Sequence, residues 1–401
     1  MIHTATAQVL ANDLAASNSD RDNPTQMDID PAYAFRVTNR IMNHLNKHYF
    51  RSRFIGFDTP IRGKHPGAPV IYASNHSGMA FPWDGMALAA GVFQRSGYKL
   101  KEAMRPIASP LLSKHRAMSP FMLKDFWRRQ GAIDATMENF DRHMDEDGVN
   151  LLIYPEGIGG IGKGFNRRYE VQRISTSMIR MSIEHKADIV LVSTVGGEYI
   201  NPLSYSFDTL NALTKRIGIP FVPVGPSLGF VVAQPWMTWF AFPAKLTFVR
   251  GQTFRPYDLV DGRPLSQVSD REIRDIRDLI HEEMQAELDD AVEVYGDKPF
   301  DIEELARTIL ENLTELHLFV PIFWPLLFWE TEKHNANNPS VQIAKSAFAE
   351  HAQTILDHVA AREADSRPTF GSLLKTLAKK PSILSLYTPG LGLLNMARGW
   401  L

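Results

Sequence analysis

Three short apolar segments constrain the fold of this chain more than any other feature. They cover residues 70–73, 149–154 and 189–195, and they are rich in branched side chains. Runs this short and this apolar are typical of strands that are buried on both faces, as in a parallel sheet covered by helices. Stretches with helical spacing separate them. We therefore predict an α/β fold with a mostly parallel central sheet flanked by helices.

The stretches around these strands have the spacing of apolar residues that helices require. Ala34, Val37, Ile41 and Leu45 recur at helical intervals, which predicts an N-terminal amphipathic helix over residues 31–50. The other helices predicted before residue 269 cover residues 83–93, 137–145 and 171–185.

The chain becomes helical in character after residue 269. Ser269 or Asp270 can cap a helix with one apolar stripe, and similar patterns follow over residues 304–318 and 341–359. Residues 1–30 lack the basic start and apolar run of a secretory signal. The predicted organisation is a flexible tail over residues 1–30, an α/β domain with its N-terminal helix over residues 31–268, and a helical C-terminal extension over residues 269–401.

Composition excludes several classes of function. The chain has 43 Lys and Arg against 45 Asp and Glu, and this balance argues against a dominant nucleic-acid surface, so we expect no nucleic-acid partner. It has no cysteine, which excludes disulfides, Cys-type zinc sites and a cysteine nucleophile. His44 and His48 lie four positions apart on the first predicted helix, but the sequence places no carboxylate cluster beside them. We therefore expect no metal site.

Two apolar stretches come near to membrane-spanning composition. Residues 316–329 are too short for a span of about 20 residues, and residues 217–244 contain five prolines. Both stretches are interpreted either as buried core or as a surface that enters one leaflet through its Trp and Phe side chains. Arginines near the first helix fit either contact with anionic headgroups or an ordinary solvated surface, and they are Arg36, Arg40, Arg51 and Arg53.

The first polar cluster follows the first predicted strand. It contains Asn75, His76, Ser77 and Gly78, and Asp84 follows at the start of a predicted helix. Ligands of open α/β sheets bind beyond the carboxyl ends of the strands. Imidazole is the usual general base near neutral pH, and a carboxylate on its other nitrogen orients it. The pair is interpreted either as a catalytic base with its orienting carboxylate or as a structural hydrogen bond.

The second polar cluster is glycine-rich and follows the next strand. Residues 154–164 read YPEGIGGIGKG, without the ending of a nucleotide P-loop and without the dinucleotide fingerprint. The segment is interpreted either as a tight strand-to-helix turn or as a cradle for a phosphate, a carbonyl oxygen or a carboxylate. The candidate residues of that cradle are Gly157, Gly159, Lys163, Arg167 and Arg168, with Glu156 accepting backbone amides of the loop.

Together these motifs resemble those of the glycerolipid and lysophospholipid acyltransferase superfamily, which includes the 1-acyl-glycerol-3-phosphate acyltransferases. That family carries Asn-His, a short gap and Asp, and later Phe-Pro-Glu-Gly. The matching residues here are Asn75, His76, Asp84, Tyr154, Pro155, Glu156 and Gly157. The resemblance covers about residues 70–249 and does not extend to the C-terminal region.

The resemblance implies transfer of a fatty acyl group from a thioester to a hydroxyl of a lysophospholipid or similar lipid. His76 would be the general base and Asp84 its orienting carboxylate. Acyl-CoA or an acyl carrier protein would deliver the acyl group as co-substrate, with no further cofactor. Substrate contacts are expected from Asn75, Ser77, Gly78 and the glycine-rich cluster, and the uncharged residues 217–244 are a candidate wall for the acyl chain. The expected location is the cytoplasmic face of a membrane, as a peripheral or monotopic protein.

The chain also departs from the family pattern. Seven residues separate His76 from Asp84 where the family has four, Ile158 and Gly159 stand in place of the usual Thr-Arg, and Ala135 replaces an arginine. Both missing arginines are associated with an acceptor phosphate, so the motifs do not imply a phosphate-bearing acceptor. Two alternatives stay open: a lipid ester hydrolase in which His76 activates water, and a non-catalytic lipid-binding protein of the same fold.

Overall fold

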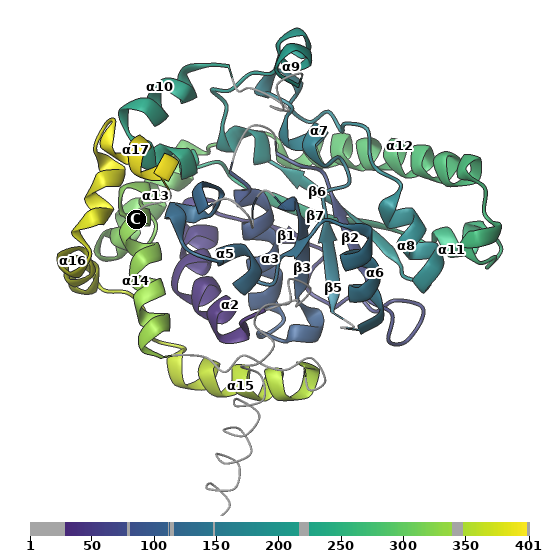
Figure 1. Ribbon diagram of the computed structural model, residues 1–401, viewed down its shortest axis with the longest axis horizontal. Helices are drawn as coiled ribbons and strands as arrows, with labels where there is room; N and C mark the ends of the chain where they lie inside the picture. Colours follow the sequence, from purple (N-terminus) through teal and green to yellow (C-terminus); the bar gives the residue numbers. More distant parts are fainter. Residues whose placement is uncertain are drawn as a thin grey trace, which may run out of the picture.

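A seven-stranded sheet lies at the centre of the molecule in the computed structural model (Figure 1). The strand order is β1-β7-β6-β2-β5-β3-β4, and every neighbouring pair is parallel except β6 and β7. The strands are β1 (Arg53–Ile55), β2 (Ile71–Ser74), β3 (Met104–Ala108), β4 (Ile133–Asp134), β5 (Asn150–Ile153), β6 (Ile189–Val195) and β7 (Thr247–Phe254). The predicted α/β class with a mostly parallel sheet is confirmed.

The structure describes residues 29–77, 81–110, 112, 116–146, 149–215, 224–338 and 348–398. The predicted tail over residues 1–30 therefore lies outside the described residues, except for Ile29 and Asp30. Gly78 also lies outside them, as does the start of the apolar stretch over residues 217–244.

Both faces of the sheet are apolar because each strand sends alternate side chains to opposite sides. In β2, Tyr72 joins the first core cluster, whereas Ile71 and Ala73 join the second. The parallel register pairs Ile71 with Leu151 of β5 and with Ile189 of β6. This burial on two faces explains why the strands are continuous apolar runs in the sequence.

Helices from both halves of the chain cover the two faces. The first core cluster packs under α2, α3 and α14, and the second packs under α6, α8 and α12. The helices of these two layers are α2 (Pro31–Val37), α3 (Trp83–Arg95), α6 (Met137–Glu146), α8 (Ser177–His185), α12 (Asp270–Tyr295) and α14 (Trp324–Asn337). The remaining helices are α5 (Phe126–Arg129), α7 (Ile158–Ile161), α9 (Asp208–Lys215), α10 (Pro226–Ala233), α11 (Pro256–Leu259), α13 (Ile302–Glu311), α15 (Phe348–Glu363), α16 (Phe370–Lys379) and α17 (Leu391–Arg398).

Most predicted helices are present with small shifts of their ends. Ser269 caps α12, and its side chain and that of Glu272 form a reciprocal capping box, as the sequence indicated. The first helix continues from α2 into two π-helical segments, Thr38–Met42 and Leu45–Tyr49. The helix predicted over residues 171–185 begins only at Ser177, and the one predicted over 304–318 divides at Asn312 into α13 and a 3₁₀ turn.

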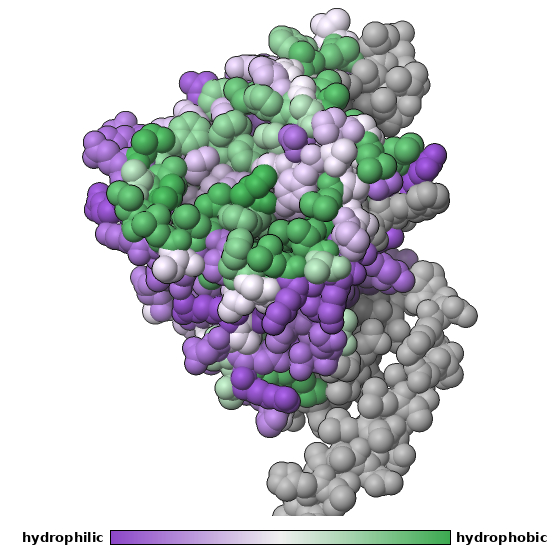
Figure 2. All heavy atoms as spheres, turned by 90° about the vertical axis from the view of Figure 1, so that its left-hand side faces the viewer, coloured by the Kyte–Doolittle hydropathy of each residue, from purple (hydrophilic) through white to green (hydrophobic). Residues whose placement is uncertain are grey.

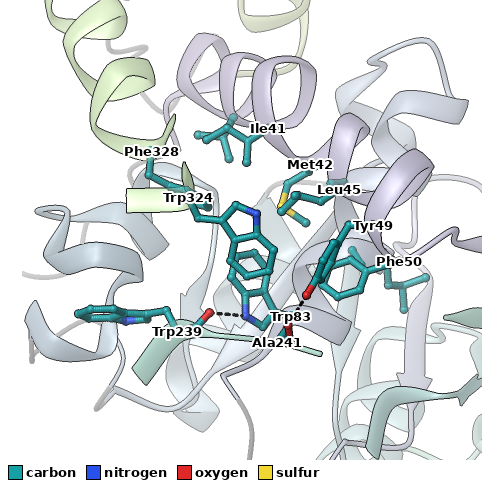
Figure 3. Packing of buried hydrophobic residues seen from close by; sticks show 14 of the residues in the cluster. Ile41, Met42, Leu45, Tyr49, Phe50, Trp83, Trp239, Ala241, Trp324 and Phe328 are labelled. Carbon is teal, nitrogen blue, oxygen red and sulfur yellow. Dashed lines mark hydrogen bonds between the residues drawn. The ribbon is translucent and has the colours of Figure 1, made fainter. Parts of the chain in front are cut away.

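The C-terminal helices are part of the same core as the sheet. Trp324 of α14 packs against Trp83 of α3, with 4.8 Å between ring centroids, and Trp83 donates its indole N–H to the carbonyl of Trp239 at 2.9 Å (Figure 3). On the other face, α12 buries Ile273, Ile280 and Leu288 in the second cluster. The region after residue 269 is thus helical as predicted, and it supplies core to both faces.

Three arginines near the first helix are buried in ion pairs and hydrogen bonds. Arg36 pairs with Glu363 at 2.7 Å, and Arg40 pairs with Glu330 at 2.6 Å. Arg51 donates to the carbonyl of Pro243 at 2.9 Å. The hypothesis that these three contact anionic headgroups is wrong, because a buried charge needs its partner inside the protein. Arg53 is exposed.

Half of the eight aromatic side chains expected in a membrane interface are core residues, and the other four are partly buried. Trp236, Trp239, Trp324 and Phe328 are all buried. Among the described residues, none of the helices combines the length and the apolar composition that crossing a bilayer requires.

Candidate active site

His76 and Asp84 form the centre of the candidate site. β2 ends at Ser74 and α3 begins at Trp83, so His76 lies just after the strand and Asp84 lies in the first turn of the helix. His76 Nδ1 lies 3.1 Å from Asp84 Oδ2, and the same oxygen accepts the backbone N–H of Ser77 at 3.0 Å. The structure therefore brings together the two residues that the sequence proposed as base and orienting carboxylate.

Asp84 is completely buried, yet its environment favours the ionised form. Burial alone raises the pKa of this carboxyl, but the attraction of His76 and the hydrogen bonds from His76 and Ser77 hold the pKa below its usual value. An ionised Asp84 fixes the proton of His76 on Nδ1. Nε2 is then the ring nitrogen that can accept a proton from a substrate.

Tyr154 completes the surroundings of His76. Its ring lies against the imidazole, with 4.4 Å between centroids and an interplanar angle of 31°. Burial and the nearby charge of Asp84 raise the pKa of the phenol well above its usual value, so it stays protonated. The sequence did not single out Tyr154 as a site residue, although its position two residues before Glu156, at the end of a strand, was a usable signal.

Glu156 holds two loops together. Oε1 accepts the backbone N–H of His76 at 2.7 Å, and Oε2 accepts that of Gln172 at 2.6 Å. Burial raises the pKa of the Glu156 carboxyl, and Lys163 with the two amide donors offsets only part of this rise. The carboxylate thus accepts backbone amides as expected, which leaves both of its oxygens engaged.

The glycine-rich segment is shaped by its close approach to His76. Gly157 has φ +55° and ψ −132°, which side-chain-bearing residues rarely adopt. A Cβ at Gly160 would lie 2.7 Å from Glu156 Cβ and 2.9 Å from His76 Cβ. The segment forms the short helix α7, so the strand-to-helix turn is present.

Three backbone amides of the two polar clusters have partners within the protein. The N–H of Gly157 donates to the carbonyl of Tyr154 at 2.9 Å, and that of Gly159 donates to the carbonyl of Glu156 at 3.1 Å. The N–H of Ser77 is bound to Asp84. The amides of Ser77, Gly157 and Gly159, which the sequence proposed as substrate contacts, are therefore not free for a substrate oxygen, because the turn, the helix start and Asp84 engage them.

Lys163 is an interior residue rather than a ligand of the predicted cradle. Its ammonium lies 3.2 Å from Glu198 Oε1 and 3.9 Å from Glu156 Oε2, and it donates to the carbonyl of Glu170 at 3.0 Å. The side chain is fully buried. A substrate anion at Lys163 is thus contradicted, since three protein oxygens already surround the cation.

The other predicted substrate contacts have structural partners. Arg167 pairs with Asp208 at 3.0 Å, and Arg168 stacks on the ring of Phe165. The Asn75 amide exchanges two hydrogen bonds with the backbone of Thr194, at 3.1 and 2.7 Å, and so ties the loop after β2 to β6. None of these residues lines the cavity described next.

A cavity of about 900 Å³ opens beside His76. Its size is at the upper end of ligand pockets in proteins. The lining from α2, α3, β3 and α5 is mainly apolar and includes Met42, Met86, Ala89, Phe93, Met104 and Phe126. At the other side the lining includes Arg173 and Arg277. Residues 224–244 contribute nothing to it, so the prediction that the stretch over residues 217–244 forms the wall of an acyl-chain groove gains no support from this cavity.

A carboxylate lies beside His44 and His48, although the sequence placed none there. Glu315 lies beside His44 and His48, and one ligand atom of each lies within 4.8 Å of the others. Burial, followed by the charge of His48, lowers the pKa of His44 to about 4. The other oxygen of Glu315 pairs with Arg367 at 2.9 Å. Arg367 already neutralises the Glu315 carboxylate, so we assign no metal ion to this cluster.

The chain is similar to uncharacterized mycobacterial proteins. Proteins of Mycobacterium bovis and Mycobacterium tuberculosis are each 26% identical over 198 residues, which is 49% of this chain and 51% of the relative. A protein of Mycobacterium leprae is 28% identical over 199 residues, 49% of this chain and 50% of the relative. The chain thus spans about half the length of the curated relatives it matches. No protein-family model and no solved structure matches the chain.

Proposed function

We propose that this protein is an O-acyltransferase that moves a fatty acyl group from a thioester to a hydroxyl of a lysophospholipid or similar lipid. The observation that carries the proposal is the position of the His76–Asp84 pair at the wall of a large, mainly apolar cavity. An imidazole with an ionised partner can remove a hydroxyl proton near neutral pH. An apolar cavity binds an acyl chain through about 0.8 kcal/mol per buried methylene.

In the proposed reaction, His76 Nε2 accepts the proton of the acceptor hydroxyl while its oxygen attacks the thioester carbonyl. The new C–O bond forms, the C–S bond breaks, and the leaving thiolate takes the proton back from His76. Asp84 orients the imidazole and stabilises its charged form. No acyl-enzyme is needed, so the mechanism agrees with a chain that has no cysteine.

The acceptor and the product both favour a membrane location, which we also propose. A lysolipid and its acylated product partition into the bilayer, so an enzyme at the cytoplasmic membrane surface avoids extracting them into water. Arg173 lines the cavity, is exposed and forms no ion pair with a described residue. Its guanidinium is suited to a phosphate, whether of a lipid acceptor or of the carrier that delivers the acyl group.

The test uses purified protein with two donors, an acyl-CoA and an acylated carrier protein, and a panel of lysophospholipids and neutral alcohols. Mass spectrometry of the lipid products identifies reaction and acceptor together. We expect an acylated lipid from the wild type and none from His76→Ala. Free fatty acid without an acylated lipid would indicate a hydrolase, and absence of turnover with every donor would favour a lipid-binding protein.

A further inference from the structure

One side of the molecule carries an exposed apolar surface that the proposed reaction does not use. It faces the reader in Figure 2, where green side chains form a broad band above a polar lower part. We define the apolar face by six residues that are 42–55% exposed: Leu228, Phe230, Val232, Leu384, Leu391 and Leu394. Large contiguous apolar patches are uncommon on soluble monomers and mark interaction sites.

The apolar face is built from segments that are far apart in the sequence. α10 supplies three of its residues, and the 3₁₀ turn Pro381–Tyr387 and α17 supply the others. The ring of Trp236, just after α10, lies 6.1 Å from that of Tyr387. Gly392 of α17 approaches Pro235 so closely that an added Cβ would lie 2.6 Å from its ring. The face is therefore one packed surface on the side of the molecule that carries α10, α16 and α17 (Figure 1).

α10 is unlike the helices that cover the sheet. Its sequence is PSLGFVVA, without a charged residue, and none of its eight residues is buried. A helix that is apolar on every side is normally surrounded by core or by lipid. A protein partner would cover one side of such a helix, whereas lipid can surround all of its outer surface.

The C-terminal segment that supplies half of the apolar face carries charges of one sign. From Ser366 to Leu401 the sequence contains five Lys and Arg and no Asp or Glu, although the whole chain has a net charge of −2. Lys375 and Lys379 of α16 are exposed, and neither forms an ion pair with a described residue. α16 packs on the turn that carries Leu384. A cationic border beside an apolar surface is complementary to anionic lipid headgroups.

We propose that the apolar face is a docking surface for a bilayer that contains anionic phospholipid. The side chains of α10 and α17 enter the boundary between headgroups and acyl chains, and Lys375 and Lys379 contact lipid phosphates. The inference deepens the proposed function by naming the surface through which the enzyme meets its membrane. It does not depend on the chemistry at His76.

The test is co-sedimentation of the full chain with two kinds of vesicle, phosphatidylcholine alone and phosphatidylcholine with phosphatidylglycerol. We expect the wild type and His76→Ala to bind equally, more strongly to the anionic vesicles, and less strongly at high salt. The double variant Leu228→Ser/Phe230→Ser should lose at least about tenfold in binding to both vesicles. Lys375→Gln/Lys379→Gln should lose about 25-fold on anionic vesicles only, about fivefold for each charge.

The matched control is Leu259→Ser/Leu279→Ser on α11 and α12, where both leucines are about half exposed and the helices lie on the opposite side in Figure 1. It should bind like the wild type.

The proposal is overturned if the wild type binds neither vesicle, or if the control weakens binding as much as the α10 variant. It is equally overturned if the face instead joins two copies of the chain by analytical ultracentrifugation, or binds an acidic carrier protein without binding vesicles. Turnover of a soluble short-chain acceptor without vesicle binding would reject the docking surface and keep the proposed function, whereas vesicle binding without turnover would do the reverse.

Discussion

Two groups of buried ionisable side chains lie on either side of Glu156, and they differ in whether they line the cavity. His76 is hydrogen-bonded to Asp84 at 3.1 Å and lines the cavity. Lys163 and Glu198 are as deeply buried, but they contact each other, Glu156 and backbone groups, and neither of them lines the cavity. The comparison shows that burial and charge alone do not mark a site. A buried ionisable group becomes a candidate for chemistry when one of its atoms is left for a ligand.

The largest effect should come from His76→Ala. Loss of a general base lowers kcat by about 10²–10⁴-fold. Some loss of folding stability accompanies it, because the buried Asp84 loses one partner and keeps only the N–H of Ser77. The measurement is steady-state acyl transfer together with thermal unfolding. An unchanged kcat would show that His76, although it lines the cavity, is no more involved in turnover than the buried charges around Lys163.

Lys163→Met should lower the stability of the fold rather than act directly on turnover. Removing the cation leaves Glu156 and Glu198 buried without their partner, which costs about 3–5 kcal/mol of folding free energy. Urea unfolding measures this loss, and the double variant Lys163→Met/Glu198→Gln should recover part of it. If Lys163→Met instead abolished turnover and left the unfolding free energy unchanged, Lys163 would belong to the active site together with His76.

Gly160→Ala probes the contact between the glycine-rich turn and the base. The added Cβ would lie 2.9 Å from His76 Cβ, and overpacking of this kind costs about 1–3 kcal/mol. We expect a displaced imidazole and a fall in kcat of about tenfold or more. Gly159→Ala is the matched control, because its nearest neighbour, Gln172 Cβ, is 3.6 Å away. Equal kcat values for the two variants would contradict the close packing of this turn on His76.

The smallest effect should come from Tyr154→Phe. The hydroxyl is buried without a hydrogen-bond partner among the described residues, so its removal should change the unfolding free energy by less than about 1 kcal/mol. The ring contact with His76 is kept, so kcat should stay within about threefold of the wild-type value. Thermal unfolding and steady-state kinetics check both values. A larger fall in kcat would show that the hydroxyl of Tyr154, and not only its ring, takes part in the reaction at His76.

Much of the fold followed from local patterns in the sequence. The strands β2, β5 and β6 were found because burial on both faces makes them apolar throughout. The start of α12 was found because Ser269 and Glu272 satisfy its first amides. β1, β3, β4 and β7 were missed, since they lie at or near the sheet edges and their side chains are partly exposed.

The sequence by itself also indicated that His76 and Asp84 can meet, since one follows a strand end and the other begins a helix only eight positions later. Their proposed roles came from the family resemblance. Only the tertiary structure decided which other charges are available to a ligand. Arg36, Arg40 and Lys163 looked like surface cations, but their carboxylate partners are brought to them by distant segments, up to 327 positions away. The position of the cavity was also decided by packing between α3 and β3. Interactions between distant segments depend on how the layers stack, and no local pattern records that.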